Sequence, residues 1–237
     1  MLKLKKRIET ALHFNMSLVG GFMGGFAVWN FCDLLGNAQT ANMITLVSDI
    51  VGCNFFTVLL RIIGVLIYFL GFAMSVIIPR YTKLNLKIWS LFFDAAAMIT
   101  LVLLPNNLEL IIYLYPIFFA MAFQWTAFSG AQGFVSSTIF STNNLRQFST
   151  SLVEAICFKN KEKLIKTKFY GLTLVSYHIG VAIACVGSMF ISIKSSFIGI
   201  MLLIPATVFV MLQNDIINVN LKPFKVNFLP NRIMKQN

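Results

Sequence analysis

The chain has 237 residues, of which 58% are hydrophobic and only 11% are charged, and its mean hydropathy is +0.80. This composition excludes a water-soluble globular domain, in which roughly a quarter of the residues are charged. The formal net charge of +11 would favour nucleic acid as the partner of a soluble protein, but no nucleic-acid-binding motif accompanies it. The composition therefore predicts an integral membrane protein.

Six apolar stretches are long enough to cross a bilayer. About 30 Å of hydrocarbon requires roughly 20 apolar residues in a helix, and only helices or closed barrels satisfy the backbone in lipid. Because the stretches are long and continuous, we expect an all-α membrane protein and not a barrel. The predicted spans cover residues 10–31, 55–78, 88–104, 108–133, 169–191 and 197–212.

The positions of Lys and Arg predict the orientation of these spans. All but two of the 19 basic residues lie in four regions: the N-terminus, the loop between spans two and three, residues 146–168 and the basic C-terminal tail. Cytoplasmic segments carry an excess of Lys and Arg. We therefore expect six crossings of the membrane, with the N-terminus and the C-terminus in the cytoplasm.

A polar segment interrupts the apolar pattern in each half of the chain. Asn37-Ala-Gln-Thr-Ala-Asn42 follows the first span, and Ser141-Thr-Asn-Asn-Leu-Arg146 follows the fourth. Residues 43–52 are apolar but too short to span, which predicts a re-entrant or interfacial half-helix with Thr40 or Asn42 as its N-cap. After the second polar segment, Ser151-Leu-Val-Glu154 has the capping-box form and predicts a second short helix that begins there and ends in the basic run of residues 159–168.

The two polar segments belong to a weak internal repeat, with residues 1–105 as the first three-helix unit and 106–237 as the second. The positions that match at an offset of 102 are Phe26 and Phe128, Thr40 and Thr142, Asn42 and Asn144, and Asn30 and Gln132; those at 109 are Gly71 and Gly180, and Ala73 and Ala182. Because each unit crosses the membrane three times, the second unit must be inverted. Inverted repeats with broken helices are typical of secondary transporters, whose site lies near the middle of the membrane. The alternative is that both polar segments only cap short helices.

The same residues carry a family resemblance. Gly-Gly-Phe followed by Asn37-Ala-Gln-Thr-Ala-Asn42-Met, and then Phe140-Ser-Thr-Asn-Asn-Leu-Arg146, resembles the YoaK-like family of six-helix bacterial membrane proteins of unknown function. The resemblance covers nearly the whole chain and implies a multi-pass protein of the bacterial plasma membrane. In that family a Thr-Gly-Asn core is usual in each half, whereas Ala41 and Asn143 stand at the glycine positions here. The resemblance implies an architecture and not an activity.

Ionisable residues inside the predicted spans are candidate functional groups, because they are costly in lipid. Asp94 is the strongest candidate for a proton or cation site; the alternative is a carboxylate that hydrogen-bonds neighbouring helices for assembly. Arg61 is its natural partner by charge, but the two residues are predicted to lie about 10 Å apart in height. His178, near the middle of the fifth span, would relay protons or serve only in packing.

Two further patterns concern helix faces. Residues 20–25 hold two interleaved G-x-x-x-G pairs, which favour close packing between helices and would also suit a homodimer interface. On the predicted fourth span, Trp125, Ser129 and Gln132 share one face, which we expect to look into the protein.

The first functional hypothesis is a small secondary transporter or permease for a small polar solute, coupled to protons. Its predicted pathway residues are Asn37, Gln39, Thr40, Asn42, Gln132, Thr142, Asn144 and Arg146, with Asp94, His178 and Arg61 as coupling candidates. The second hypothesis is a non-transporting membrane scaffold that docks lipid or another protein through its basic cytoplasmic loop.

Catalysis is not expected from this sequence. It has no phosphate-binding glycine loop, no Ser/His/Asp set and no His/Cys spacing for a metal, so we expect neither an enzyme nor a cofactor or metal. The expected partners are membrane lipids, a second copy of the chain in a homodimer, and a small polar solute.

Overall fold

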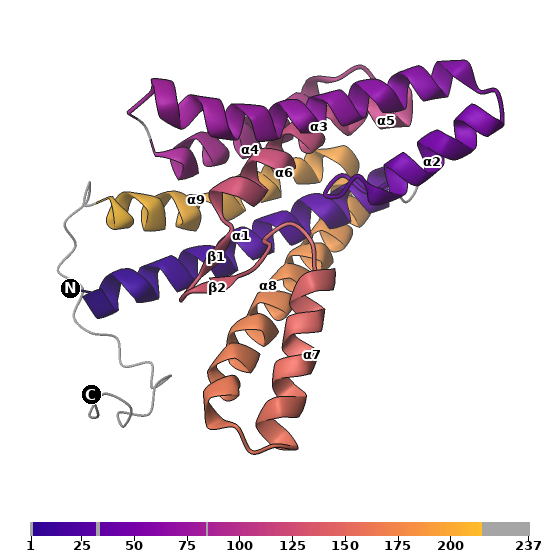
Figure 1. The fold of residues 1–237 in the computed structure, drawn as a ribbon. Helices are drawn as coiled ribbons and strands as arrows, with labels where there is room; N and C mark the ends of the chain where they lie inside the picture. Colours follow the sequence, from indigo (N-terminus) through magenta and orange to yellow (C-terminus); the bar gives the residue numbers. More distant parts are fainter. Residues whose placement is uncertain (1, 32–33, 84, 215–237) are drawn as a thin grey trace.

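The computed structural model describes residues 2–31, 34–83 and 85–214, and most of them are helical (Figure 1). The helices are α1 (Leu2–Asn30), α2 (Thr40–Val51), α3 (Phe55–Tyr81), α4 (Leu86–Leu103), α5 (Leu110–Tyr113), α6 (Tyr115–Ala127), α7 (Thr142–Ile156), α8 (Lys161–Ile191) and α9 (Ser196–Gln213). A 3-10 turn, η1 (Ser192–Ser195), joins α8 to α9. Two short strands, β1 (Gly130–Ala131) and β2 (Phe134–Val135), lie between α6 and α7.

Five helical segments in the described part of the chain are long and apolar enough to cross a membrane. They are Leu4–Asn30, Phe55–Tyr81, Leu86–Leu103, Leu110–Ala127 and Lys161–Gln213. This result is consistent with a membrane protein, as the composition predicts. The last segment has 53 residues and contains α8, η1 and α9, where the sequence predicts two separate spans. Six crossings therefore stay a prediction.

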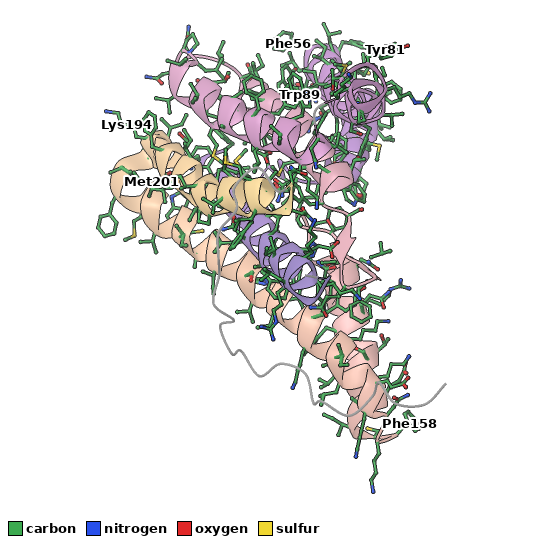
Figure 2. All side chains as sticks on the ribbon, turned by 90° about the vertical axis from the view of Figure 1, so that its left-hand side faces the viewer. Phe56, Tyr81, Trp89, Phe158, Lys194 and Met201 are labelled. Atoms are coloured by element: carbon green, nitrogen blue, oxygen red, sulfur yellow. The ribbon has the colours of Figure 1, made fainter. Side chains whose placement is uncertain are left out.

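The long helices form two bundles, and each half of the chain contributes its first long helix to the other half (Figure 1). α1 packs against α8 and α9, whereas α6 packs against α3 and α4. α2 runs along α3 in one bundle, α7 runs along α8 in the other, and α4 and α9 join the two bundles. In Figure 2, Phe158 marks the end of the projecting α7–α8 hairpin, far from Phe56, Tyr81 and Trp89 in the other bundle.

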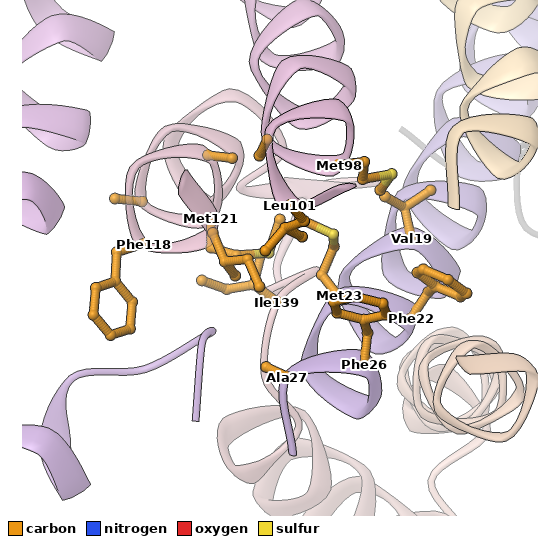
Figure 3. Packing of buried hydrophobic residues seen from close by; sticks show 14 of the residues in the cluster. Val19, Phe22, Met23, Phe26, Ala27, Met98, Leu101, Phe118, Met121 and Ile139 are labelled. Carbon is orange, nitrogen blue, oxygen red and sulfur yellow. The ribbon is translucent and has the colours of Figure 1, made fainter. Parts of the chain in front are cut away.

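The core lies where α1, α4 and α6 meet the loop before α7 (Figure 3). Met23 of α1, Leu101 of α4, Met121 of α6 and Ile139 of the loop are all fully buried in one cluster. Since lipid tails are as apolar as these side chains, the cluster stabilises the fold through van der Waals packing and not through exclusion of water. A loop residue in this cluster shows that part of the connecting chain lies deep in the protein.

Glycines allow α1 and α8 to pack backbone against backbone. A Cβ on Gly21 would lie 1.9 Å from the carbonyl oxygen of Tyr177, and a Cβ on Gly180 would lie 1.9 Å from that of Leu18. The glycine face thus serves close packing between α1 and α8 of the same chain, as predicted. The face is therefore not free for the predicted homodimer interface, and a homodimer stays a prediction.

The predicted fourth span, residues 108–133, is not one continuous helix. α6 ends at Ala127, and the chain then forms the β1–β2 hairpin around Gln132 and Gly133. These two residues have φ values of 57° and 81°, the left-handed backbone that a tight two-residue hairpin turn requires. The predicted all-α class is confirmed, but the prediction that the fourth span continues to residue 133 is wrong.

Candidate functional site

Two half-helices, α2 and α7, follow loops that are partly buried, and the predicted start of the second at Ser151 is wrong because that residue lies within α7. α2 begins at Thr40 and has 12 residues, and α7 begins at Thr142 and has 15. Their N-cap positions are Gln39 and Ser141, and neither side chain makes a capping hydrogen bond. The half-helix predicted after the first polar segment is thus present, but the prediction of Thr40 or Asn42 as its N-cap is wrong.

The loops that lead into the half-helices meet at Asn37. Its Nδ2 donates to the carbonyl oxygens of Gly20, at 2.8 Å, and of Ile139, at 2.6 Å. The Tyr68 hydroxyl donates to the Asn37 carbonyl at 3.1 Å, and the Tyr177 hydroxyl lies 3.4 Å from Nδ2. Asn37 therefore ties both loops to α1, α3 and α8. We call these two loops, residues 34–39 and 136–141, the crossing.

Two glycines of α1 make room for the crossing. A Cβ on Gly20 would lie 2.1 Å from the carbonyl oxygen of Thr138, and a Cβ on Gly24 would lie 2.6 Å from Nδ2 of Asn37. The two interleaved glycine pairs of α1 thus have different neighbours, since one pair faces α8 and the other faces the crossing.

Asn42 and Asn144 each close the loop in front of their own half-helix. Nδ2 of Asn42 donates to the carbonyl of Leu35 and to Oε1 of Gln39, both at 3.3 Å. Nδ2 of Asn144 donates to the carbonyl of Ser137 at 2.7 Å, again seven residues earlier. These two predicted pathway residues are buried and hold the loops in place, as the capping alternative requires.

A hydrogen-bonded chain continues from Asn144 to α1. The Ser136 hydroxyl donates to Oδ1 of Asn144 at 2.9 Å, so its oxygen is left to accept from Nε2 of His13, at 3.0 Å. The His13 ring is buried and stacks on Phe169 at 5.3 Å. Sequence reasoning missed His13 as a site residue; the available signal was a polar side chain at the start of an apolar span.

Gln124 of α6 was also missed, although it is fully buried next to the crossing. Its Nε2 donates to the carbonyl of Met16 at 3.1 Å and to the Thr138 hydroxyl at 3.0 Å. Within the described residues its Oε1 meets no partner, and neither does Oδ1 of Asn37 or Nε2 of Gln39. Each unpaired buried atom costs about 1–3 kcal/mol, and such atoms point to a place where water or a ligand binds.

Three predicted pathway residues are exposed at the half-helices. Thr40 and Thr142 are the first residues of α2 and α7. Arg146 lies further along α7, and its Nη2 donates to Oδ1 of Asn143 at 3.2 Å. Their side chains are exposed and do not take part in the hydrogen bonds at Asn37.

Gln132 does not reach the crossing. It is exposed in the hairpin turn, and its Nε2 donates to the Thr10 hydroxyl at 2.9 Å. The predicted inward face of Trp125, Ser129 and Gln132 is not formed, because α6 ends at Ala127, before two of its members.

Asp94 is the one coupling candidate that is fully buried. The Ser90 hydroxyl donates to its Oδ2 at 3.4 Å, and its Oδ1 has no partner in the part of the chain that the structure describes. Arg61 instead pairs with Asp49 of α2, with Nε 2.6 Å from Oδ2. Arg61 is therefore paired with Asp49 and not with Asp94, and sequence reasoning did not identify Asp49 as its partner.

His178 lies on the exposed face of α8. Its Nδ1 donates to the carbonyl of Leu174 in its own helix at 2.8 Å. The structure therefore does not bring His178 into the polar region around Asn37, although the neighbouring Tyr177 does reach it.

The fold is that of a helical protein with several apolar helices long enough to cross a membrane and two shorter helices, α2 and α7, beside the crossing, consistent with an integral membrane protein. The chain belongs to a family described as protein of unknown function (DUF1275), whose profile matches residues 12–211. This confirms the expected resemblance at the level of an uncharacterised family, while the narrower likeness to YoaK-like proteins stays a prediction. Searches among curated proteins and among solved structures returned no match.

The structure explains why this chain needs no glycine at the two positions where the family resemblance implies one. Ala41 and Asn143 are each the second residue of a half-helix. Since neither has a positive φ, the backbone at these positions does not need glycine, and Ala and Asn fit without strain.

Proposed function

We propose that this protein is a small secondary transporter of the plasma membrane, in which the crossing holds a small polar solute midway along the pathway. The observation that carries the proposal is the contact between the two half-helix loops at Asn37. Irregular backbone at membrane depth is tolerated only where protein buries it or where it lines a cavity. Transporters use such broken helices to bind their solutes, whereas a protein that needs only packed spans gains nothing from them.

An inverted repeat accounts for the contacts at the crossing. Asn37 bonds the carbonyl of Ile139, which is 102 positions away, the offset that aligns the two polar segments. Tyr68 and Tyr177, which both contact Asn37, are 109 positions apart, the offset that aligns the later spans. Contacts between equivalent positions are expected near an axis that relates two inverted units, so these offsets support the repeat.

The helix packing supports the same relation. The packing of α1 on α8 and α9 has its counterpart in the packing of α6 on α3 and α4. α4 and α9 have 18 residues each and pack against one another, as equivalent helices at an axis would. In this arrangement α8 and α9 are separate spans that reverse at η1, where Ser192 has a φ of 51°, which gives six crossings.

The observed state fits a closed transporter. Asn37 and Asn144 are 3% and 2% exposed, so the polar side chains at the centre of the crossing are closed to solvent. Two surface grooves, of about 470 Å³ between α8 and α9 and about 300 Å³ between α4 and α9, are lined almost entirely by apolar residues, and neither includes the crossing. Access for a solute therefore requires the two bundles to move, and the α4–α9 contact is where they would slide.

Asp94 is the residue that we propose couples this movement to protons. It lies on the buried face of α4, the helix that joins the bundles, with one weak hydrogen bond from Ser90. A carboxylate is costly inside a span unless it is protonated or paired. Asp94 would be neutral while it holds a proton, and binding and release of that proton would couple the movement of the bundles to protons.

Uptake into proteoliposomes tests the proposal. The purified chain, reconstituted with an imposed pH gradient, is screened with radiolabelled amino acids, sugars, amides and small organic acids. We expect uptake of at least one solute, loss of that uptake in Asn37→Ala and normal uptake in Gln132→Ala, which changes an exposed amide. Asp94→Asn should lose gradient-driven uptake and keep solute exchange. Absence of uptake by the wild-type chain, or full uptake by Asn37→Ala, would contradict the proposal.

The scaffold remains a second candidate because of the α7–α8 end. There Phe158 is 75% exposed beside the exposed Lys159 and Lys161. Such a basic and apolar surface suits anionic lipid. If the scaffold is the function, glutamate at these two lysines abolishes activity in cells, and uptake is absent from the wild-type chain.

A further inference from the structure

The starts of α2 and α7 determine what kind of solute the proposed transporter would bind. Neither first turn contains an acidic residue, and neither N-cap side chain makes a capping bond. The first N–H groups of a helix have no intrahelical partner, and a helix start carries about half a positive charge. Each start therefore offers hydrogen-bond donors and a positive potential.

Both starts lie close to the same point. Asn37 and Ile139, which are in contact at 2.6 Å, each precede a half-helix by three residues. Three residues span at most about 10 Å, so both positive ends lie within about 10 Å of that contact. Two positive ends on either side of one contact repel one another, and a negative charge between them would offset this repulsion.

Gln39 adds an independent observation at the start of α2. Its side chain is held against the first turn, because its Oε1 accepts from Nδ2 of Asn42 at 3.3 Å. Nε2 of the same amide is buried and without a partner among the described residues, and Gln39 as a whole is only 8% exposed. A buried donor at a helix start lacks an acceptor, which a bound oxygen atom would supply.

Arg146 contributes a full positive charge on the other half-helix. It lies one turn into α7, where Nη2 bonds the neutral side chain of Asn143. No carboxylate of the described residues pairs with it. The two starts are thus positive through their backbones and, on α7, through a side chain.

We propose that the crossing binds a small anion, a carboxylate or an inorganic oxyanion, at the start of α2. Nε2 of Gln39 and the first N–H groups of α2 donate to the anion, and the start of α7 with Arg146 adds positive potential. Helix starts bind carboxylate and phosphate groups in this way in many proteins. The inference rests on the proposed transport function and names its substrate class.

A thermal-shift comparison of charged and neutral isosteres tests the inference. The detergent-purified full chain is heated in potassium formate, acetate, nitrate or phosphate at constant ionic strength, with gluconate as the bulky reference anion. Acetamide and formamide serve as neutral counterparts of acetate and formate. Because a ligand that binds only the folded state stabilises it, we expect at least one small anion to raise the melting temperature by about 2 °C or more. Acetamide and formamide should give no shift.

Matched variants locate the site. Gln39→Glu places a carboxylate at the start of α2, so it should remove the shift caused by the anion. Gln132→Glu makes the same change in charge at the exposed hairpin turn and should keep the shift. Gln39→Met removes the donor without adding charge and should weaken anion binding several-fold, which provides a second test if the glutamate variant does not fold. An unchanged shift in both Gln39 variants would overturn the inference.

The outcomes also separate this inference from the transport proposal. A shift with acetamide and not with acetate, together with uptake of a neutral solute, would overturn the anion site and leave transport standing. No binding of any probe and no uptake into proteoliposomes would overturn both.

Discussion

The starts of α2 and α7 share one plan and differ in how firmly they are held. In each, an asparagine at the third helical position bonds a carbonyl seven residues earlier. Asn42 does so at 3.3 Å, whereas Asn144 does so at 2.7 Å and is further held by Ser136 and His13. Because Asn144 has more and shorter hydrogen bonds than Asn42, we expect the junction between the loop and α2 to open more readily than that at α7.

The two hairpins that carry the half-helices each contain an ion pair, and the two pairs differ in burial. An ion pair between Asp49 and Arg61 joins α2 to α3. In the other unit, Lys163 and Glu154 form a more exposed ion pair between α8 and α7 at 2.6 Å, and the Thr167 hydroxyl donates to the Ser151 hydroxyl at 3.0 Å. Because the Asp49–Arg61 pair is more buried than the Lys163–Glu154 pair, it should contribute more to its hairpin. The expected movement of α2 is therefore that of a whole α2–α3 hairpin and not of α2 alone.

Removal of the ion pair should have the largest effect. Arg61→Met leaves the Asp49 carboxylate largely buried without its partner, which should cost about 3 kcal/mol of unfolding free energy. Thr167→Val removes a neutral hydroxyl contact in the other hairpin and should cost about 1 kcal/mol. Chemical denaturation in detergent measures both variants. Adding Asp49→Leu to Arg61→Met should recover most of the loss, and equal losses in the two hairpins would refute the difference between them.

Removal of the two loop asparagines should give smaller and unequal effects. Asn144→Ala removes several hydrogen bonds and should cost about 1.5 kcal/mol, whereas Asn42→Ala removes two long ones and should cost about 0.5 kcal/mol. The same denaturation measurement applies, with Gln132→Ala as an exposed control. A larger loss in Asn42→Ala would reverse the ranking of the two loops.

Local patterns in the sequence predicted the parts of the site that depend on neighbouring residues. The apolar stretch after Asn42 is too short to span, and this alone indicated a half-helix. The 102-position offset paired Asn42 with Asn144, and the two residues do make the same bond in the structure. Such features are readable because chain length and residue spacing determine them.

The parts of the site that depend on distant residues could not be predicted in this way. His13 and Ser136 are 123 positions apart, and Gln124 and Met16 are 108 apart. Hydropathy treats Gln124 as one more polar residue near the end of a span, and it gives no sign that α6 stops at Ala127. The hairpin at Gln132 depends on two consecutive residues with positive φ, which an apolar pattern does not indicate.

The most direct test of alternating access at the crossing is thiol labelling from each side of the membrane. Gln39→Cys and Ser141→Cys are placed singly in a chain whose native cysteines, Cys32, Cys53, Cys157 and Cys185, are replaced, with glycine at 53 because φ there is 57°. We expect a membrane-impermeant reagent to label position 39 from one side and position 141 from the other, with a bound solute protecting both. If neither position reacts from either side during solute exchange, the crossing is not on a transport pathway.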